Sequence, residues 1–399
     1  MKIFNCDNCG HPVFFENVQC LNCGCALAFL PDQLSMAALL APAGPAADGS
    51  PGLWVRSHPP EGVPLQYRMC LNHDLHQSCN FAVPPEDPNH LCVSCRQTRV
   101  FPDLSIPENS QRWYRIEVAK RRLFYTLARL GLASTTPPAA GSMQDGPVYE
   151  FLADVPGGPR VMTGHNQGLI TLNIAEADDD ERERRRVQLG EPYRTLLGHL
   201  RHESGHFYWD RLIREGNRID DFRAVFGDES LDYQQALQAH YAADHSANEW
   251  QVDFVSAYAT SHPWEDWAET WAHYLHMVDL LETAAAYGTQ VEVPGMSGGT
   301  GSGPDTVTNP FSSAVTDFDQ LVQQWVPVTL MLNSLNRSLG QDDAYPFALS
   351  QGALHKLRFV HDVIHQAVDI PLIDDKADMT KPADSQPADT TAPAAVPAA

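Results

Sequence analysis

The sequence predicts an α+β protein in which small cysteine-rich modules precede a mixed domain whose C-terminal part is mostly helical. Three observations support this prediction. All nine cysteines lie before position 96 of a 399-residue chain. Short strand-like segments follow the cysteines, and helical periodicity dominates the rest. The hydrophobic content of 43% is ordinary for a globular protein and sufficient for a sizeable core.

The overall charge excludes some classes of partner. Twenty-seven basic and 50 acidic residues give a net charge of -23, which disfavours a nonspecific grip on nucleic acid or on an anionic membrane. No apolar run reaches bilayer length, and the first residues contain no signal-peptide core. We therefore expect a cytoplasmic protein without a nucleic-acid or membrane partner.

The first cysteine module covers residues 1–32 and is interpreted as a zinc ribbon. Its two Cys-x-x-Cys knuckles can supply four thiolates to one tetrahedral structural zinc. The segment is too small to fold on a core alone, so metal binding would supply folding energy. Cys25 is left over, either as a free thiol or as an alternative to Cys23. The four predicted ligands are Cys6, Cys9, Cys20 and Cys23.

A second module of zinc knuckles is expected over residues 67–100. Residues 33–66 are interpreted as a linker, because Ala, Pro and Gly are frequent over 33–53. A short helix is expected within it, over residues 34–40. Either His73 or His76 could replace one thiolate of the second module. Basic residues near both modules are few. We therefore expect the modules to dock a protein partner or to act as a scaffold. The predicted ligands of this second structural zinc are Cys70, Cys79, Cys92 and Cys95.

The mixed domain is expected over residues 101–290 and opens with a helix at 111–130. Asn109 and Ser110 can cap this helix. We interpret its cations as a solvated face: Arg115, Lys120, Arg121 and Arg122.

Three strand-like segments follow, at 148–152, 160–163 and 169–175. In the last segment, apolar and polar residues alternate enough for a strand with one solvated side. We interpret it as an edge strand that could hold an extended peptide by β-addition.

The segment His202-Glu203-Ser204-Gly205-His206 has the pattern H-E-x-x-H inside a stretch of helical periodicity. Residues four apart share a helix face, so His202 and His206 can bind one metal ion. Glu203 can reach a water on that metal without being a ligand. Zinc lowers the pKa of such a water toward about 7, and the carboxylate takes its proton. The order of helix, short strands and metal-binding helix is that expected of a zincin-type α+β domain.

Two histidines leave zinc one protein ligand short. The metzincin continuation is absent, because Trp209 and Leu212 stand at its Gly and His positions. The third ligand must therefore come from downstream, and residues 261–276 are the best candidate. Glu265 and Glu269 share a helix face there, so that one can bind zinc while the other accepts a hydrogen bond from a ligand histidine.

The start of this downstream segment has helix signals. Ser261 can act as its cap, and Pro263 suits its first turn.

The two helices together resemble a known group of enzymes. H-E-x-x-H followed by a later Glu-x-x-x-(Asp/Glu) resembles the gluzincin metallopeptidases. The arrangement Tyr258 … Glu265-Asp-Trp-Ala-Glu269 is similar to the anthrax-lethal-factor-like branch, in which a Tyr lies seven residues before the ligand Glu. With the N-terminal cysteine ribbon included, residues 1–290 resemble the bacterial putative zinc-binding metallopeptidases.

This resemblance implies a role for each motif residue. It implies that His202, His206 and Glu265 bind a catalytic zinc. Glu203 would be the general base and then the general acid to the leaving amine. Tyr258 would donate a hydrogen bond to the oxyanion, and Glu269 would orient a ligand histidine. Alternative third ligands are Glu269 itself, Asp244 and His245.

The sequence thus predicts a zinc-dependent metallopeptidase with a peptide or protein substrate, one catalytic zinc and two structural zincs. One alternative is a zinc-ribbon module that binds a protein and carries an inactive zincin-like body. Another is a zinc amidase acting on a non-peptide substrate. A degenerate site should lack a ligand or the base, and this chain lacks neither, which favours the enzyme.

Beyond the mixed domain, residues 307–373 are expected to form a helical C-terminal extension with helices at 318–339 and 348–367. The tail at 374–399 contains almost no large apolar residues, so we expect it to be disordered.

Overall fold

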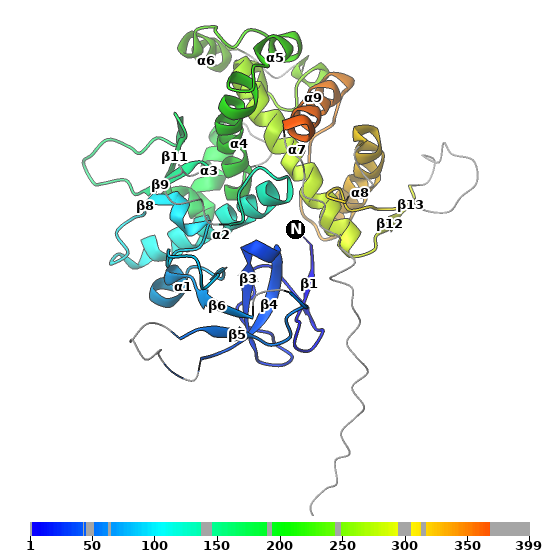
Figure 1. Cartoon of the computed structure of the whole chain (residues 1–399). Helices are drawn as coiled ribbons and strands as arrows, with labels where there is room; N and C mark the ends of the chain where they lie inside the picture. The colour runs from blue at the N-terminus through cyan, green and yellow to red at the C-terminus, as the bar shows by residue number, and fades with distance from the viewer. Residues whose placement is uncertain are drawn as a thin grey trace, which may run out of the picture.

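The computed structural model describes residues 2–42, 44, 52–62, 65–136, 146–189, 194–243, 249–293, 305–312 and 317–367. The predicted α+β class is confirmed: a β-rich cysteine module lies below a larger body of helices with a small sheet (Figure 1). Within these ranges, no helix is both long and apolar enough to cross a bilayer. The predicted disordered tail lies outside the described residues.

The cysteine module is built on one antiparallel sheet with the strand order β3-β4-β5-β6-β7. A backbone bridge between Phe29 and Phe81 also brings the first strand to the last, so the sheet curls on itself. A separate hairpin, β1 (Phe4–Asn5) with β2 (Pro12–Val13), carries the first knuckle. The sheet strands are β3 (Ala26–Leu30), β4 (Ser35–Leu40), β5 (Trp54–Arg56), β6 (Gln66–Met69) and β7 (Ala82–Val83).

The predicted linker over residues 33–66 is wrong, because β4 and β5 lie within it. The short helix expected at 34–40 is wrong for the same reason: β4 pairs with β3 from Ser35 to Leu39 and with β5 at Leu39 and Leu40. Ala, Leu and Met are good helix formers, and pairing to two neighbouring strands overrides that preference. Both groups of four cysteines therefore belong to one folded module.

Helix α2 (Pro107–Arg129) connects this module to the body. It begins four residues earlier than predicted, at Pro107, and no side chain of Asn109 or Ser110 caps it. The expectation of a solvated cationic face is also wrong, because Lys120 and Arg121 are buried. Lys120 pairs with Glu117 at 2.9 Å, and an Arg121 guanidinium N–H donates to the carbonyl of Ser78 at 2.7 Å. The pattern missed this because the cysteine module covers Arg121, while Thr98 and the ring of Tyr149 cover Lys120.

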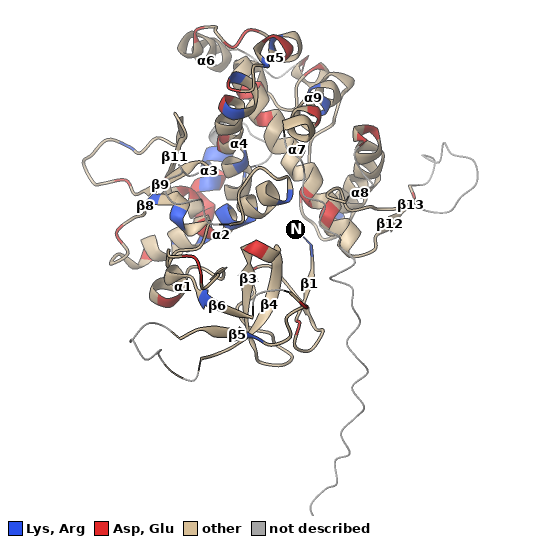
Figure 2. Cartoon of the chain, viewed as in Figure 1, with Lys and Arg blue, Asp and Glu red and all other residues tan. Residues whose placement is uncertain are grey.

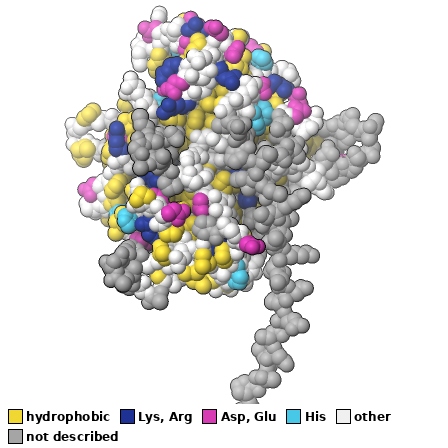
Figure 3. Space-filling model, in the orientation of Figure 1, with side chains coloured by type: hydrophobic (Ala, Val, Ile, Leu, Met, Phe, Trp, Pro, Cys, Tyr) yellow, Lys and Arg dark blue, Asp and Glu magenta, His cyan; other side chains and the backbone are white. Residues whose placement is uncertain are grey.

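An aromatic cluster packs the cysteine module onto α2. The rings of Phe29 and Phe81 lie 4.7 Å apart, and Phe15 contacts Tyr125 of α2 with ring centroids 5.6 Å apart. Phe124 and Tyr125 belong to the same buried core as the cysteines. Hydrophobic side chains are also visible on the outer surface of the module, at the bottom of Figure 3.

A second sheet of four strands lies beside α2, with the order β10-β11-β9-β8. β9 and β11 confirm two predicted strands, but residues 160–163 are not a strand and β10 follows them. The prediction of an edge strand at 169–175 is wrong: β11 has neighbours on both sides, and β10 is the edge. Alternation reveals a strand but not its neighbours. The strands are β8 (Thr98–Val100), β9 (Val148–Leu152), β10 (Gly164–Asn166) and β11 (Leu169–Asn173).

The body is organised around two helices that lie side by side, α4 (Leu196–Trp209) and α7 (Pro263–Ala286) (Figure 1). Gly205 lies where they touch: a Cβ there would be 2.9 Å from the Ala268 Cα. Indole N–H groups of α7 donate to α4, from Trp267 to the Gly205 carbonyl at 2.9 Å and from Trp271 to the Ser204 hydroxyl at 3.1 Å. The two middle residues of H-E-x-x-H are therefore small because α7 packs against them.

The remaining helices surround this pair. The two helices predicted for the C-terminal extension are present as α8 and α9, which contribute Trp325 and Leu357 to the core shared with α4 and α7. Charged residues of both signs gather around α2 and α3 (Figure 2). A π-helical turn, Asp210–Arg214, continues α4, and β12 (Gln290–Val291) pairs with β13 (Asp305–Thr306). The other helices are α1 (Leu71–His76), α3 (Asp179–Leu189), α5 (Ile219–Phe226), α6 (Tyr233–Ala242), α8 (Phe318–Ser338) and α9 (Gln351–Ala367).

Replacing Gly205 with Ala should force α4 and α7 apart, because the nearest atom is backbone and cannot rotate away. We expect the free energy of unfolding in urea to fall by about 1–3 kcal/mol. Gly164→Ala is the matched control, since its added Cβ meets nothing within 4 Å. A Gly205→Ala protein as stable as the control would contradict the close contact.

Candidate functional site

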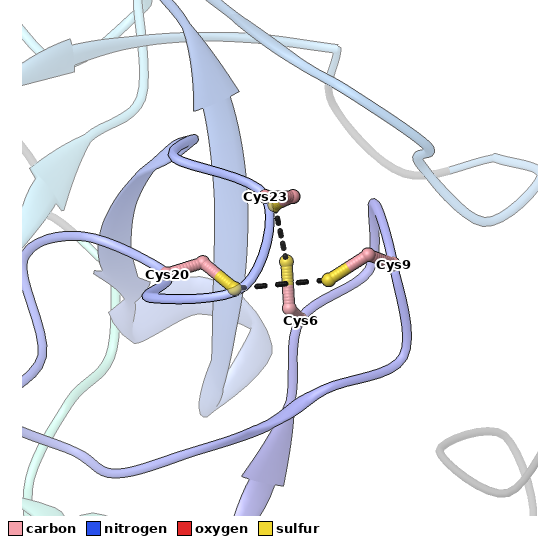
Figure 4. Close-up of side chains that lie close together, drawn as sticks. All are labelled: Cys6, Cys9, Cys20 and Cys23. Carbon is pink, nitrogen blue, oxygen red and sulfur yellow. Dashed lines mark hydrogen bonds between the residues drawn. The ribbon is translucent and has the colours of Figure 1, made fainter.

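The thiols of the first cysteine cluster, Cys6, Cys9, Cys20 and Cys23, point toward one another from two knuckle loops (Figure 4). The Sγ atoms of Cys6 and Cys23 lie 3.7 Å apart, as do those of Cys9 and Cys20. Four sulfurs at about 2.3 Å from a tetrahedral zinc would be separated by about 3.8 Å, so the cluster fits one zinc. Cys25 is not part of this group.

The second cluster is more deeply buried. Its thiols come together as predicted, with 3.8 Å between the Sγ atoms of Cys79 and Cys92. His73 and His76 lie on α1 outside this group, and His73 contacts Asp74 instead. Burial lowers the pKa of nearby Arg121, but the thiolates of Cys79 and Cys95 outweigh burial and raise it. A positive guanidinium therefore lies beside the charge that four zinc-bound thiolates would carry.

The third group joins α4 to α7. The Glu265 Oε2 atom lies 3.0 Å from His202 Nε2 and 3.5 Å from His206 Nε2. This oxygen is buried and forms no hydrogen bond of normal geometry with any described residue. Leaving a buried carboxylate oxygen unsatisfied is costly, and a cation between the three side chains would remove the cost. Two imidazoles and one carboxylate are a common ligand set for catalytic zinc.

Outer contacts hold these three side chains in place. Glu269 lies where the sequence analysis expected it, with its Oε1 2.7 Å from His202 Nδ1. The Tyr233 hydroxyl donates to the other oxygen of Glu265 at 2.7 Å, and the Ser256 hydroxyl donates to Glu269 at 2.6 Å. Sequence reasoning missed Tyr233 and Ser256, because no spacing relates them to the H-E-x-x-H motif.

The start of α7 differs from the expectation. His262 is the cap, accepting a hydrogen bond at Nδ1 from the Trp264 N–H at 3.1 Å, whereas Ser261 was expected in this role. Pro263 occupies the first turn as predicted. Trp264 then packs against His206 with ring centroids 3.7 Å apart, which fixes the orientation of that imidazole.

Glu203 lies on the same helix as the two histidines, one residue after His202. Its Oε1 is 3.3 Å from His199 Nε2, whereas its buried Oε2 has no hydrogen-bond partner in the described part of the chain. Burial raises the pKa of Glu203, but the hydrogen bond from His199 and the neighbouring histidine charges lower it overall. The group is therefore a carboxylate at neutral pH.

Tyr258 opens a 3-10 turn, Tyr258–Ser261, and its ring lies 6.0 Å from that of His202. Burial, followed by the Glu265 charge, raises the pKa of Tyr258, so its hydroxyl stays protonated and can donate a hydrogen bond. The alternative ligands Asp244 and His245 lie outside the described residues.

A cavity of about 320 Å³ adjoins this site. Its wall includes the edge strand β10, with His165 and Asn166, and it shares Tyr233 and Trp264 with the metal-ligand surroundings. Burial and the neighbouring His206 lower the pKa of His165 to about 4, so this imidazole is neutral. Sequence reasoning missed β10 because only three residues form it. The remaining lining residues are Gln167, Trp209, Asp210, Arg214, Glu229 and His262.

Comparison with known families agrees with this geometry. Residues 109–363 match the family described as "Putative zinc-binding metallo-peptidase", and residues 3–106 match a zinc-ribbon domain. The chain belongs to this metallopeptidase family. The resemblance inferred from the sequence is thereby confirmed, and the family match extends through α8 into α9.

Several relatives of this metallopeptidase are similar over nearly their whole length. Uncharacterized proteins of Mycobacterium bovis and of two Mycobacterium tuberculosis strains are each 40% identical to it over 370 residues. The matches cover 92% of this chain and 96% of each relative. No solved structure matches the chain significantly.

Zinc content tests the three ligand groups. We expect three zincs per chain in the wild type, one for each group. Glu265→Ala should retain two after dialysis against a mild chelator, because two histidines alone hold zinc weakly. Glu215→Ala, at an exposed carboxylate, should retain three. An unchanged count in Glu265→Ala, measured by atomic absorption, would show that Glu265 is not a required ligand.

Tyr233→Phe should weaken zinc binding at the site that includes Glu265. The substitution removes only the hydroxyl that donates to Glu265 Oε1, and loss of such an outer contact costs about 10-fold in metal affinity. Competition with a chromogenic chelator measures the change. Tyr287→Phe, at an exposed tyrosine, provides the baseline, and equal affinities in the two variants would refute the role of Tyr233.

Proposed function

We propose that this family member is a zinc-dependent peptidase that hydrolyses peptide bonds with Glu203 as general base. One observation carries the proposal: two buried carboxylate oxygens without hydrogen bonds, Glu265 Oε2 and Glu203 Oε2, lie on adjoining helices around the histidine pair. Other buried polar atoms of the described residues also lack a hydrogen-bond partner, but these two are grouped at one histidine pair, as expected where a ligand completes the site. His202, His206 and Glu265 would hold the ion.

Zinc at this position supplies Lewis acidity, which polarises the scissile carbonyl and lowers the pKa of the attacking water. Glu203 accepts the proton of that water as its oxygen bonds to the carbonyl carbon. Glu203 then returns the proton to the amine nitrogen as the C–N bond breaks, so no other reactant is needed. Tyr258 donates a hydrogen bond to the oxyanion of the tetrahedral intermediate.

The surroundings favour a polypeptide substrate. Strand β10 is the edge of its sheet beside α4, so its outer backbone groups can pair with an extended chain. Trp209 and Trp264 in the adjoining cavity offer apolar faces for a substrate side chain. A small amide would use neither feature, and for this reason we favour a peptidase over an amidase.

We further propose that the protein acts in the cytoplasm on a peptide or protein. The cysteine modules would serve chiefly as a scaffold, because their aromatic core is shared with α2. The exposed Leu21 at the second knuckle is a place where a protein partner could dock. A binding module with an inactive body is the alternative, and the complete set of site residues argues against it.

Glu203→Gln tests the proposal, because it keeps the size of the side chain and removes the base. We expect zinc content to be unchanged and cleavage of a quenched fluorescent peptide library to fall by about 10²–10⁴-fold. Glu183→Gln, at an exposed carboxylate of α3, should cleave like the wild type. Wild-type cleavage by Glu203→Gln would overturn the mechanism. Absence of cleavage in the wild type would favour the binding module.

A further inference from the structure

His199 lies one helical turn before Glu203 and occupies the space between two carboxylates. Its Nε2 is 3.3 Å from Glu203 Oε1, and its Nδ1 is 2.7 Å from Glu176 Oε2. Both ring nitrogens are therefore engaged, one by the catalytic helix and one by the turn that follows β11. No motif of the sequence points to His199 or to Glu176.

Glu176 is itself held firmly. Its carboxylate is almost completely buried, and it accepts a hydrogen bond from the Thr163 hydroxyl at 2.6 Å. Arg185 of α3 donates to it at 2.7 Å, and Arg194 donates at 3.1 Å. An exposed ion pair between residues i and i+4 of a helix usually contributes little to stability. The His199–Glu203 pair differs, because His199 is also held by the buried Glu176. Here Glu176, which is bound by Arg185 of α3, is connected through His199 to the proposed base Glu203.

These contacts make the surroundings of the two Glu203 oxygens different. Oε1 is occupied by His199, whereas Oε2 is buried and free of hydrogen bonds within the described structure. A free glutamate side chain loses conformational entropy when it is fixed for reaction. A base whose orientation is already fixed avoids that cost at the moment of reaction.

We propose that His199, anchored by Glu176, is a positioning residue that holds Glu203 Oε1 so that Oε2 alone accepts the proton of the attacking water. The inference rests on the proposed peptidase function and deepens it. The carboxylates of Glu176 and Glu203 contact the His199 ring, and Arg185 and Arg194 bind the same Glu176 carboxylate. Burial lowers the pKa of His199, but these carboxylates raise it to about 9, so the ring can donate to both at neutral pH.

The test compares His199→Phe, which removes both hydrogen bonds, with His199→Gln, which can still donate to Glu203. His355→Phe, at an exposed histidine of α9, is the matched control. All variants are made in the full chain, and circular dichroism melting checks that they fold. Cleavage of the fluorescent peptide library gives kcat, KM and the pH profile of kcat.

We expect His199→Phe to bind zinc normally, to lose about 10–100-fold in kcat with KM nearly unchanged, and to shift the acidic limb of the profile. His199→Gln should recover most of this loss, which a merely structural defect would not allow. A His199→Phe protein with wild-type kcat and pH profile would overturn the inference. If that variant does not fold, a Glu176→Gln protein with wild-type kcat and pH profile would overturn it.

A second readout does not need a substrate. In the Co²⁺-loaded protein, the pH midpoint of the visible spectrum should move in Glu203→Gln, and it should also move in His199→Phe. If no peptide is cleaved by the wild type but both midpoints move, the proposed function fails and the positioning role stands. An unmoved midpoint in His199→Phe, or in Glu203→Gln, overturns the positioning role.

Discussion

The close contact of α4 with α7 at Gly205 is the constraint on which the candidate site depends. The histidines come from one helix and Glu265 from the other, so their convergence requires a short distance between the helix axes. A residue without a side chain at the contact allows it, and two indole N–H groups fix the register. Trp267 and Trp271 therefore do more than fill the core, because their hydrogen bonds determine which face of α7 meets the motif.

Helix α2 extends this constraint to the cysteine modules. On one side it contributes Phe124 and Tyr125 to the core that contains the thiols. On the other, the Tyr125 hydroxyl donates to Glu282 of α7 at 2.6 Å, and the Thr126 hydroxyl donates to Asp279 at 2.7 Å. Zinc in the cysteine clusters would thus stabilise a surface against which the α4–α7 pair rests.

Buried carboxylates are unusually frequent around the site, and nearly all have a defined partner. Glu176 has two arginines, a threonine and a histidine, and Asp279 has Arg201 and Thr126. Burying a charge without a partner is costly, so these networks can persist only in a single arrangement. Other buried carboxylate oxygens without hydrogen bonds, on Glu117 and Asp266, face a lysine, whereas those of Glu203 and Glu265 lie around a histidine pair, which is why they indicate a ligand.

Sequence alone determined the features that depend on local spacing: the α+β class, both cysteine quartets, the histidine pair on one helix face, and Glu265 with Glu269 on another. Only the tertiary structure decided the features that depend on neighbours. It turned a predicted linker into β4 and β5, moved the edge of the sheet to β10, and buried Lys120 and Arg121. It also brought Tyr233, Ser256, His199 and Glu176 to the site. The reason is physical: periodicity shows which face of an element is apolar, whereas strand pairing, helix contacts and long-range hydrogen bonds join residues whose separation in the chain has no fixed value.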